Sequence, residues 1–191
     1  MSNHVKLEIL DYYKKKLSEM IGSDDFPRFF NNFDSNKIIK YSELQNYNTI
    51  TELLPELFDY RFILIEEQKN SGHWTVIARN KNNIYYFDSY GVKPDGEWQY
   101  ISYFIRKMLN EETNQLTILL NSAKNEGFNV ESNKVKYQSD KKGINTCGRY
   151  CIMLVKCIEK GYDMNNIERL LDEGCSKYNC NYDILVCRYF P

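Results

Sequence analysis

Apolar and polar positions alternate most clearly in the middle of the chain. An apolar run, RFILIEE at residues 61–67, is followed by HWTVIARN at residues 73–80. A short polar segment, NKNN at residues 80–83, leads into IYYFDSY at residues 84–90. A period of two predicts strands, and a tight polar turn between two strands predicts an antiparallel hairpin.

Two stretches have apolar residues at the spacing of a helix. Residues 3–20 carry one stripe, with Gly22 as the expected stop. Residues 147–161, CGRYCIMLVKCIEKG, carry a stronger stripe that ends at Gly161. Shorter helical patterns are expected at residues 49–58, capped by Asn48 or Thr49 and interrupted at Pro55, at residues 98–108 and at residues 164–174.

The remaining patterns are weaker. Residues 23–37 are polar and turn-rich and are expected to be mostly loop, while residues 38–44 suit a short strand or a turn. Residues 116–121 and 133–138 read as further strands. Strands in a cluster with helices around them predict an α+β fold with a central, mostly antiparallel or mixed sheet flanked by helices.

The composition bounds the class of protein. A length of 191 residues suits one domain, in which residues 1–60 form a helical and loop extension packed on a core of residues 61–191. With a net charge of −1, the chain lacks the bulk charge of a nucleic-acid-binding protein. No apolar run is long enough for a membrane span, and the first residues lack the apolar stretch of a signal peptide. We therefore expect a monomer that is not secreted.

Six cysteines lie in the last third of the chain. Without a secretion signal they are expected to be reduced thiols. Their spacings lack the close pairs or the Cys/His quartet of a zinc site, and no histidine lies nearby, so neither a metal nor a cofactor is expected. Most of them should act as small core residues, Cys151 and Cys157 included. The six are Cys147, Cys151, Cys157, Cys175, Cys180 and Cys187.

Three residues suggest chemistry by where they fall in these elements. His73 opens one strand, Asp88 closes the next, and Cys147 opens the strong helix. The start of one hairpin strand lies beside the end of the other, so His73 and Asp88 are expected to be neighbours. If the first turn of the helix faces that edge, the three form a nucleophile, a base and an orienting carboxylate.

Each residue type suits its role. A thiolate is favoured at a helix N-terminus beside an imidazole, and an aspartate fixes the imidazole tautomer. Gly148 would leave room for substrate, and Gln138 could donate to an oxyanion. From spacing alone these residues also fit plain structural roles: a packed histidine, a turn-forming aspartate and a core cysteine.

The motifs GHW, FDSYG, Gln138 and NTCGRYC, in that order, resemble the adenovirus-type maturation proteases and their cellular relatives, the ubiquitin-like-protein (SUMO-type) proteases. Those families carry His-Trp, Asp or Glu, Gln and Cys-Gly in the same order. The wider pattern, from about residue 38 to about residue 161, is especially similar to the versions encoded by virophages, polinton-like elements and large DNA viruses.

The resemblance implies a papain-like α+β core in permuted chain order. It makes Cys147 the nucleophile, His73 the base, Asp88 the orienting carboxylate and Gln138 the oxyanion donor. The loop between Gln138 and Cys147 is longer than in the cellular relatives, so Asn145 is a rival donor. Trp74 would wall a narrow slot that admits glycine before the scissile bond.

The implied activity is a cysteine endopeptidase that cleaves capsid or other structural precursors after glycine, in the virion and the host cytoplasm. A peptide activator is compatible with the family, whereas dependence on DNA is not carried over. Three alternatives stay open: a deconjugating protease for a ubiquitin-like modifier, an acetyltransferase with a similar Cys-His-acid set, and a binding module without activity.

Overall fold

A five-stranded mixed sheet forms the centre of the protein. The computed structural model describes residues 3–191. The inner strands pair antiparallel and each outer strand pairs parallel with its neighbour, in the order β1-β2-β3-β4-β5. The strands are β1 (Ile38–Lys40), β2 (Phe58–Gln68), β3 (Ser71–Asn80), β4 (Asn83–Phe87) and β5 (Asn129–Ser132).

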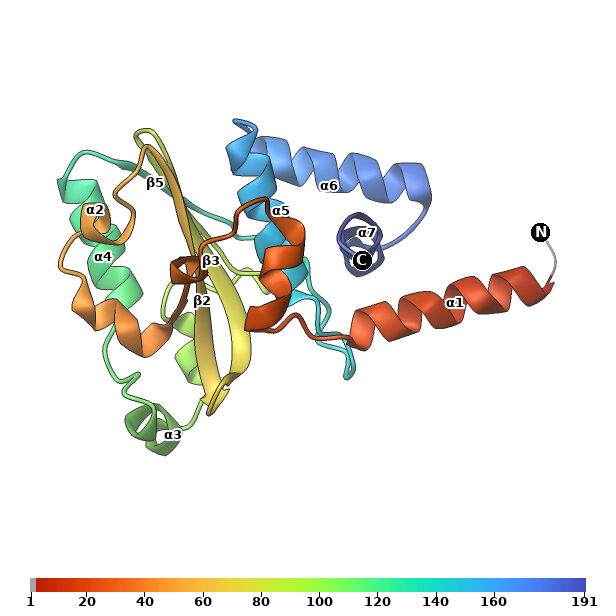
Figure 1. Cartoon of the computed structure of the whole chain (residues 1–191), viewed down its shortest axis with the longest axis horizontal. Helices are drawn as coiled ribbons and strands as arrows, with labels where there is room; N and C mark the ends of the chain where they lie inside the picture. The colour runs from red at the N-terminus through yellow and green to blue at the C-terminus, as the bar shows by residue number, and fades with distance from the viewer. Residues whose placement is uncertain (1–2) are drawn as a thin grey trace.

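Helices cover both faces of this sheet (Figure 1). On one face lie α5 (Cys147–Glu159), α6 (Met164–Tyr178) and α7 (Tyr182–Tyr189); on the other lie α2 (Ile50–Leu53) and α4 (Gln115–Asn125). α1 (Asn3–Ser18) extends away from the body, and α3 (Tyr103–Met108) lies below the sheet. Short 3-10 helices span Ser23–Phe29, Ser35–Lys37, Tyr41–Asn46 and Gly96–Gln99.

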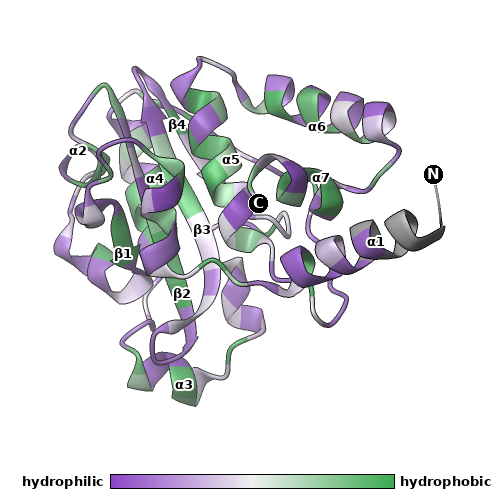
Figure 2. Ribbon diagram, turned by 45° about the vertical axis from the view of Figure 1, so that its right-hand side comes forward, coloured by the Kyte–Doolittle hydropathy of each residue, from purple (hydrophilic) through white to green (hydrophobic). Residues whose placement is uncertain are grey.

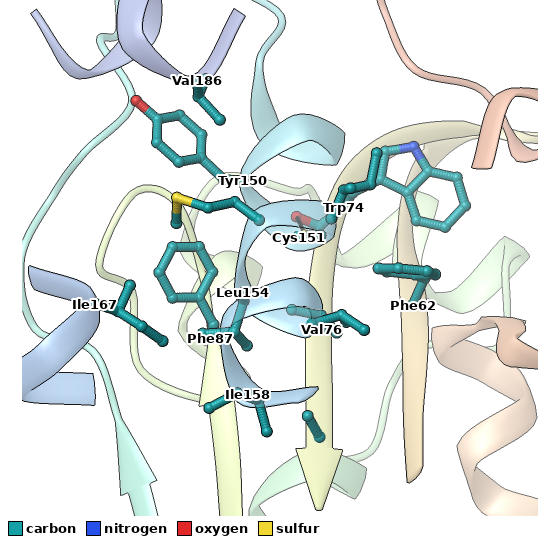
Figure 3. Close-up of a cluster of buried hydrophobic side chains, with 14 of the residues drawn as sticks. Phe62, Trp74, Val76, Phe87, Tyr150, Cys151, Leu154, Ile158, Ile167 and Val186 are labelled. Carbon is teal, nitrogen blue, oxygen red and sulfur yellow. Dashed lines mark hydrogen bonds between the residues drawn. The ribbon is translucent and has the colours of Figure 1, made fainter. Parts of the chain in front are cut away.

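The two faces of the sheet bury two separate apolar cores. Trp74 and Val76 of β3 share one core with the fully buried Leu154 and Ile158 of α5 (Figure 3). Ala78 of β3 belongs to the same cluster. The opposite face, with Ile77 among its residues, packs against α2 and α4. Figure 2 shows the hydrophobic residues gathered on α5 and on the strands beside it. Burial from both sides explains why the apolar runs of β2 and β3 are nearly continuous.

The predicted hairpin of β3 and β4 is confirmed, and β2 forms a second hairpin with β3 that was not predicted. β2 and β3 pair with Leu64 opposite Trp74, and β3 and β4 pair with Val76 opposite Phe87. At Gly72 a side chain would meet the backbone oxygen of Ile65 at 2.0 Å, so only glycine fits beside the bulge in β2. This close approach sets the position of the residue that follows it, His73.

Several weaker expectations were wrong. Residues 116–121 belong to helix α4, because their apolar residues pack on one side of a helix rather than alternating across a sheet. Residues 133–138 form no strand. The side chains of Asn133 and Gln138 instead accept hydrogen bonds from Asp88 and Ser89, in the segment that follows β4. Residues 23–37 contain two 3-10 helices, and residues 98–108 divide into a 3-10 turn and α3.

Other boundaries hold or move slightly. α1 ends at Ser18, four residues before Gly22, whereas α5 is followed by Gly161 with a positive φ of 85°, as expected of its stop. Thr49 is the cap of α2, because its side chain accepts a hydrogen bond from the Glu52 N–H. α6 runs past Gly174, and α7 was not predicted at all.

The segment between α1 and β1 is packed on the core. The Phe26 ring stacks on Phe62 of β2 with their centroids 4.2 Å apart and is fully buried. Among residues 3–191, none of the helices combines the length and apolarity that crossing a bilayer requires.

Glu111, just after α3, is a fully buried acid. Its Oε1 atom accepts a hydrogen bond from the Glu66 N–H at 3.1 Å, and its Oε2 atom has no partner. Burial raises the pKa of Glu111 to about 7. A buried carboxyl group with one unpartnered oxygen is more stable protonated than ionised.

We expect Glu111→Gln to stabilise the protein more at pH 8 than at pH 5. The folded pKa lies above the unfolded one, so the contribution of Glu111 is fully favourable below the unfolded pKa and is lost as the pH rises through about 7. Glutamine cannot titrate, so the gain should grow by about 1–2 kcal/mol over this range. Urea unfolding at both pH values measures it, and an equal gain at each would contradict the assignment.

Candidate active site

The site lies where β4 leaves the sheet. The pairing of β3 with β4 stops at Val76 and Phe87, so the preceding residues of β3 have no strand beside them on that edge. The first turns of α5 take the vacant place. The Cys151 thiol donates to the Trp74 carbonyl at 3.4 Å, and the Trp74 N–H bonds to the sulfur of Cys147. The helix thus completes the edge of the sheet and brings its first residue beside β3.

His73 and Asp88 are neighbours, as the hairpin predicted. Nε2 of His73 lies 3.0 Å from Oδ2 of Asp88, and both side chains are buried. The other carboxylate oxygen, Oδ1, accepts the Tyr90 N–H at 2.6 Å. Asn133 fixes the backbone of Asp88 from both sides, accepting from its N–H and donating to its carbonyl. The carboxylate is therefore rigidly held against the imidazole.

Cys147 lies on the opposite side of the same imidazole. Because Nε2 faces Asp88, the hydrogen bond between the ring and the Cys147 thiol involves Nδ1. Burial alone would raise the pKa of Cys147. The hydrogen bond and charge of His73, together with the N–H groups of Trp74 and Gly148, bring that pKa below its ordinary value.

The pKa values of His73 and Asp88 are shifted in the directions that favour their charged forms. Burial disfavours the imidazolium, but the charge and hydrogen bond of Asp88, followed by the contact with Cys147, raise the pKa of His73 well above its ordinary value. Burial likewise opposes ionisation of Asp88, and the charge and hydrogen bond of His73 lower its pKa overall. The arrangement favours a thiolate, an imidazolium and a carboxylate in a row.

The N-terminus of α5 is left without a side-chain cap. Thr146 stands at the cap position, but its hydroxyl donates to Oδ1 of Asp183 at 2.6 Å. Asp183, from α7, also accepts the Ser139 N–H, so it holds both ends of the loop before the helix. The N–H groups of the first turn therefore face negative charge at Cys147, and the Gly148 N–H already bonds to its sulfur.

Gln138 is buried at the edge of the cleft and makes three hydrogen bonds. Its Oε1 accepts from the Ser89 hydroxyl at 2.8 Å, while Nε2 donates to the Tyr90 hydroxyl at 2.9 Å and to the Ile144 carbonyl at 3.1 Å. Both amide hydrogens are therefore occupied. Donation to an oxyanion would require the Tyr90 hydroxyl to give up its bond.

Tyr90 is a residue that the sequence did not reveal. Its ring stacks on His73, with centroids 5.0 Å apart and planes 27° apart, and its hydroxyl meets Gln138. It lies in the FDSYG motif, two positions after Asp88, and that position was the only available signal. Tyr90 thus covers the His73 ring and links it to Gln138, the expected oxyanion donor.

The segment after α1 forms the other wall. Nδ2 of Asn145 donates to the Ser18 carbonyl at 2.8 Å, and the Trp74 indole N–H donates to the Ile21 carbonyl at 2.8 Å. A side chain at Gly148 would meet Cβ of Ile21 at 2.7 Å. The space that Gly148 leaves is therefore filled by Ile21 and is not open to a substrate, and Asn145 ties this segment to the loop before α5.

These parts enclose a cleft of about 260 Å³. It is bounded by the segment after α1 on one side and by the start of β3 on the other. Every residue expected at the site lines it except Asp88 and Gly148. The lining residues are Met20, Ile21, Gly22, Ser23, Leu64, Glu67, Asn70, Ser71, Gly72, His73, Trp74, Tyr90, Gln138, Asn145 and Cys147.

Glu97 is a second residue that the sequence did not reveal. It is buried in the 3-10 turn Gly96–Gln99. One side-chain atom each of His73, Asp88 and Glu97 lies within 4.8 Å of the other two, close enough in principle to hold a metal ion. However, Nε2 of His73 bonds to Asp88, and Asp88 bonds to Glu97. The three side chains therefore form a hydrogen-bonded chain and not a set of open ligands.

Trp74→Ala is expected to destabilise the protein by about 3–5 kcal/mol. The indole is almost fully buried, meets Phe26 edge to face at 5.0 Å and satisfies the Ile21 carbonyl. Urea unfolding measures the loss. A cost below about 1 kcal/mol would show that the indole contributes little packing. The milder Trp74→Phe variant serves to test whether the side chain also restricts the substrate.

Gln138→Ala is expected to reduce kcat/KM more than Asn145→Ala. Gln138 lines the cleft together with Cys147, and we expect its amide to exchange the bond to Tyr90 for one to an oxyanion, so that its removal costs at most about 2.7–4 kcal/mol of transition-state stabilisation. Asn145 directs its amide away, toward Ser18. The measurement is kcat/KM of both variants by steady-state kinetics, at a temperature at which both are fully folded. A larger loss for Asn145→Ala would reverse the assignment.

Fold and site together define an α+β protein in which a cysteine, a histidine and an aspartate meet at the end of a mixed sheet. No protein-family model matches the chain. The Uncharacterized protein V9 of Sputnik virophage is 32% identical to it over 151 residues, which cover 78% of this chain and 83% of that protein. The chain belongs to the same family as this virophage protein.

Proposed function

We propose that the protein is a cysteine endopeptidase. The observation that carries the proposal is the row of three groups in which His73 bonds to Asp88 on one side and to Cys147 on the other, with the pKa of the thiol lowered. This arrangement supplies an activated nucleophile, a proton carrier and an orienting carboxylate.

In the proposed reaction, the Cys147 thiolate attacks the carbonyl carbon of the scissile bond. The oxyanion that forms lies near the N–H groups of the first turn of α5. The His73 imidazolium gives its proton to the leaving amine, and the C–N bond breaks to leave a thioester. Water, deprotonated by His73, then attacks the thioester, and the Cys147 thiolate departs from the peptide acid.

The fold supports the finer proposal of a papain-like core in permuted order. The helix that begins with the cysteine packs along the strand that carries the histidine, and the acid follows on the neighbouring strand. His73, Asp88, Gln138 and Cys147 follow one another in the order of the adenovirus-type proteases that the sequence resembles.

A virophage relative favours a viral protein as substrate. We infer that the enzyme matures capsid or other structural precursors and acts in the virion and host cytoplasm. Ile21 and Trp74 both line the cleft with Cys147, and Ile21 fills the space beside Gly148, so we infer a narrow slot at the nucleophile. A narrow slot suits cleavage after glycine, whose backbone can approach the nucleophile most closely.

The test is to incubate the purified protein with capsid precursors and a peptide library and to map new termini by mass spectrometry. We expect cleavage after glycine in flexible segments, with none by Cys147→Ala. Efficient cleavage after bulky residues would refute the narrow slot. No cleavage at all, together with ordinary reactivity of Cys147 toward iodoacetamide, would refute the enzyme.

A deconjugating protease for a ubiquitin-like modifier is a second candidate. It is favoured by a group of exposed apolar side chains on and before α3, which a folded partner could cover. The same assay distinguishes it, because such an enzyme would release only a folded modifier and would leave capsid precursors intact. The side chains, each 60–72% exposed, are Tyr100, Tyr103, Phe104 and Met108.

A further inference from the structure

Glu97 lies against Asp88 and close to His73. Its side chain is only 6% exposed and is hydrogen-bonded to the Asp88 carboxyl group. One of its carboxyl oxygens lies within 4.8 Å of both a ring nitrogen of His73 and a carboxylate oxygen of Asp88. Cys147, His73, Asp88 and Glu97 therefore form one continuous row, of which the proposed mechanism uses only the first three.

Two carboxyl groups in buried contact cannot both be ionised at little cost, so one of them holds a proton. Asp88 receives hydrogen bonds from the His73 ring and from the Tyr90 N–H, which stabilise its ionised form. Oε1 of Glu97 is buried and receives none. Glu97 is thus the group that carries the proton and donates it toward Asp88.

The surroundings of Glu97 agree with this assignment. Burial, followed by the negative charge of Asp88, raises the pKa of Glu97 to about 8, although the positive charge of His73 opposes the shift. Glu67 of β2 adds a further negative charge. The other titratable groups that face it are Tyr86 and Tyr90, whose own pKa values are raised by burial and by nearby acids including Glu97.

We propose that Glu97 is a positioning residue that, as a neutral acid, donates a hydrogen bond to Asp88 and holds it in line with His73. The proposal deepens the proposed function and rests on it, because Glu97 acts on the reaction only through Asp88 and His73. When Glu97 loses its proton, the hydrogen bond is lost and a second negative charge faces the pair. The row is then held less firmly, while the imidazolium keeps its proton to a higher pH.

Because the chain has only two histidines, the ring of His73 can be followed directly. In a 15N-histidine-labelled protein, His4→Gln assigns the remaining ring signals to His73. We expect the His73 signals of the otherwise native protein to show a separate inflection near pH 8, where Glu97 ionises. Glu97→Gln, which keeps a donor but cannot ionise, should lose this inflection and should release the ring proton at a lower pH.

The matched control is Glu111→Gln, which removes another buried glutamate of raised pKa whose interactions are with Glu66 and Lys40 rather than Asp88. It should leave the His73 titration unchanged. An inflection near pH 8 that persists in Glu97→Gln, or that disappears in Glu111→Gln, would overturn the assignment. So would its absence from the native protein.

A second readout follows the thiol. Mass spectrometry measures the rate at which iodoacetamide modifies Cys147 at pH 7. Glu97→Gln should react within about twofold of the native rate, while Glu97→Ala should react about tenfold more slowly, as for loss of one hydrogen bond to a charged group. A native rate in Glu97→Ala would overturn the positioning role. If Glu97→Ala does not fold, the NMR titration of Glu97→Gln decides.

These outcomes separate the two proposals. If no peptide is cleaved but Glu97→Gln alters the His73 titration as expected, the link from Glu97 to His73 stands and the peptidase proposal fails. If peptides are cleaved and the titration of Glu97→Gln equals that of the native protein, the role of Glu97 fails and the peptidase proposal stands.

Discussion

Cys147→Ala is expected to abolish peptide cleavage, with a loss in kcat/KM of about 10³-fold or more. No other group can replace the sulfur, because Cys151, one turn further along, donates its thiol hydrogen to the Trp74 carbonyl and has a pKa raised by burial. Alanine leaves the first turn of α5 and its N–H groups in place. The measurement is kcat/KM on a glycine-containing peptide, with the fold followed by circular dichroism.

Cys151→Ala is the matched control. It removes a fully buried thiol from the same face of α5, so it should cost about 1–2 kcal/mol of stability while activity is retained below the melting temperature. Substantial cleavage by folded Cys147→Ala would exclude Cys147 as the nucleophile. If both variants were fully folded and equally inactive, the loss of activity would reflect a general disturbance of α5 and not the role of one cysteine.

Asp88→Asn is expected to lower kcat/KM by about 10²–10⁴-fold while the protein stays folded. An amide has a single oxygen. If that oxygen keeps the bond from the Tyr90 N–H, the amide hydrogens face Nε2 of His73. The ring must then accept at Nε2 and carry its proton on Nδ1, toward Cys147, where it can no longer take the proton of the thiol.

The control for Asp88→Asn is Asp11→Asn. Asp11 is an exposed residue of α1 that pairs with Lys14 on the surface and is distant from β4 in the sequence. It should leave activity unchanged. The decisive measurement is kcat/KM as a function of pH. A change of tautomer lowers kcat/KM at every pH, whereas a loss of folding would appear as a lower melting temperature. Activity within threefold of native would contradict an orienting role for Asp88.

The sequence predicted best the parts of the fold that depend on local pattern. The turn at Asn80–Asn83 and the alternation on either side of it required His73 and Asp88 to meet, and the strong stripe after residue 147 required a helix to start at Cys147. The run LTILLN failed because a short, fully apolar segment suits a buried helix as well as a strand.

The residues that the sequence missed owe their positions to tertiary contacts. Glu97 reaches Asp88 from a separate 3-10 turn, and Asp183 reaches the loop before α5 from a helix that the pattern did not predict. No spacing rule connects such distant positions. Gln138 was expected to be an oxyanion donor from its place before the helix and from the resemblance, but only the structure shows that its amide hydrogens are already bonded.

The early end of β4 has a consequence for how the protein can change. A longer β4 would pair with the free edge of β3 and would take the Trp74 N–H and carbonyl that now contact Cys147 and Cys151. Two residues added to β4 alone would preserve which side chains face each core, yet would move Asp88 along β3 by about 6–7 Å, beyond reach of His73. An insertion that both cores tolerate would thus separate Asp88 from His73, so the length of β4, and not only its apolar pattern, determines whether these two side chains meet.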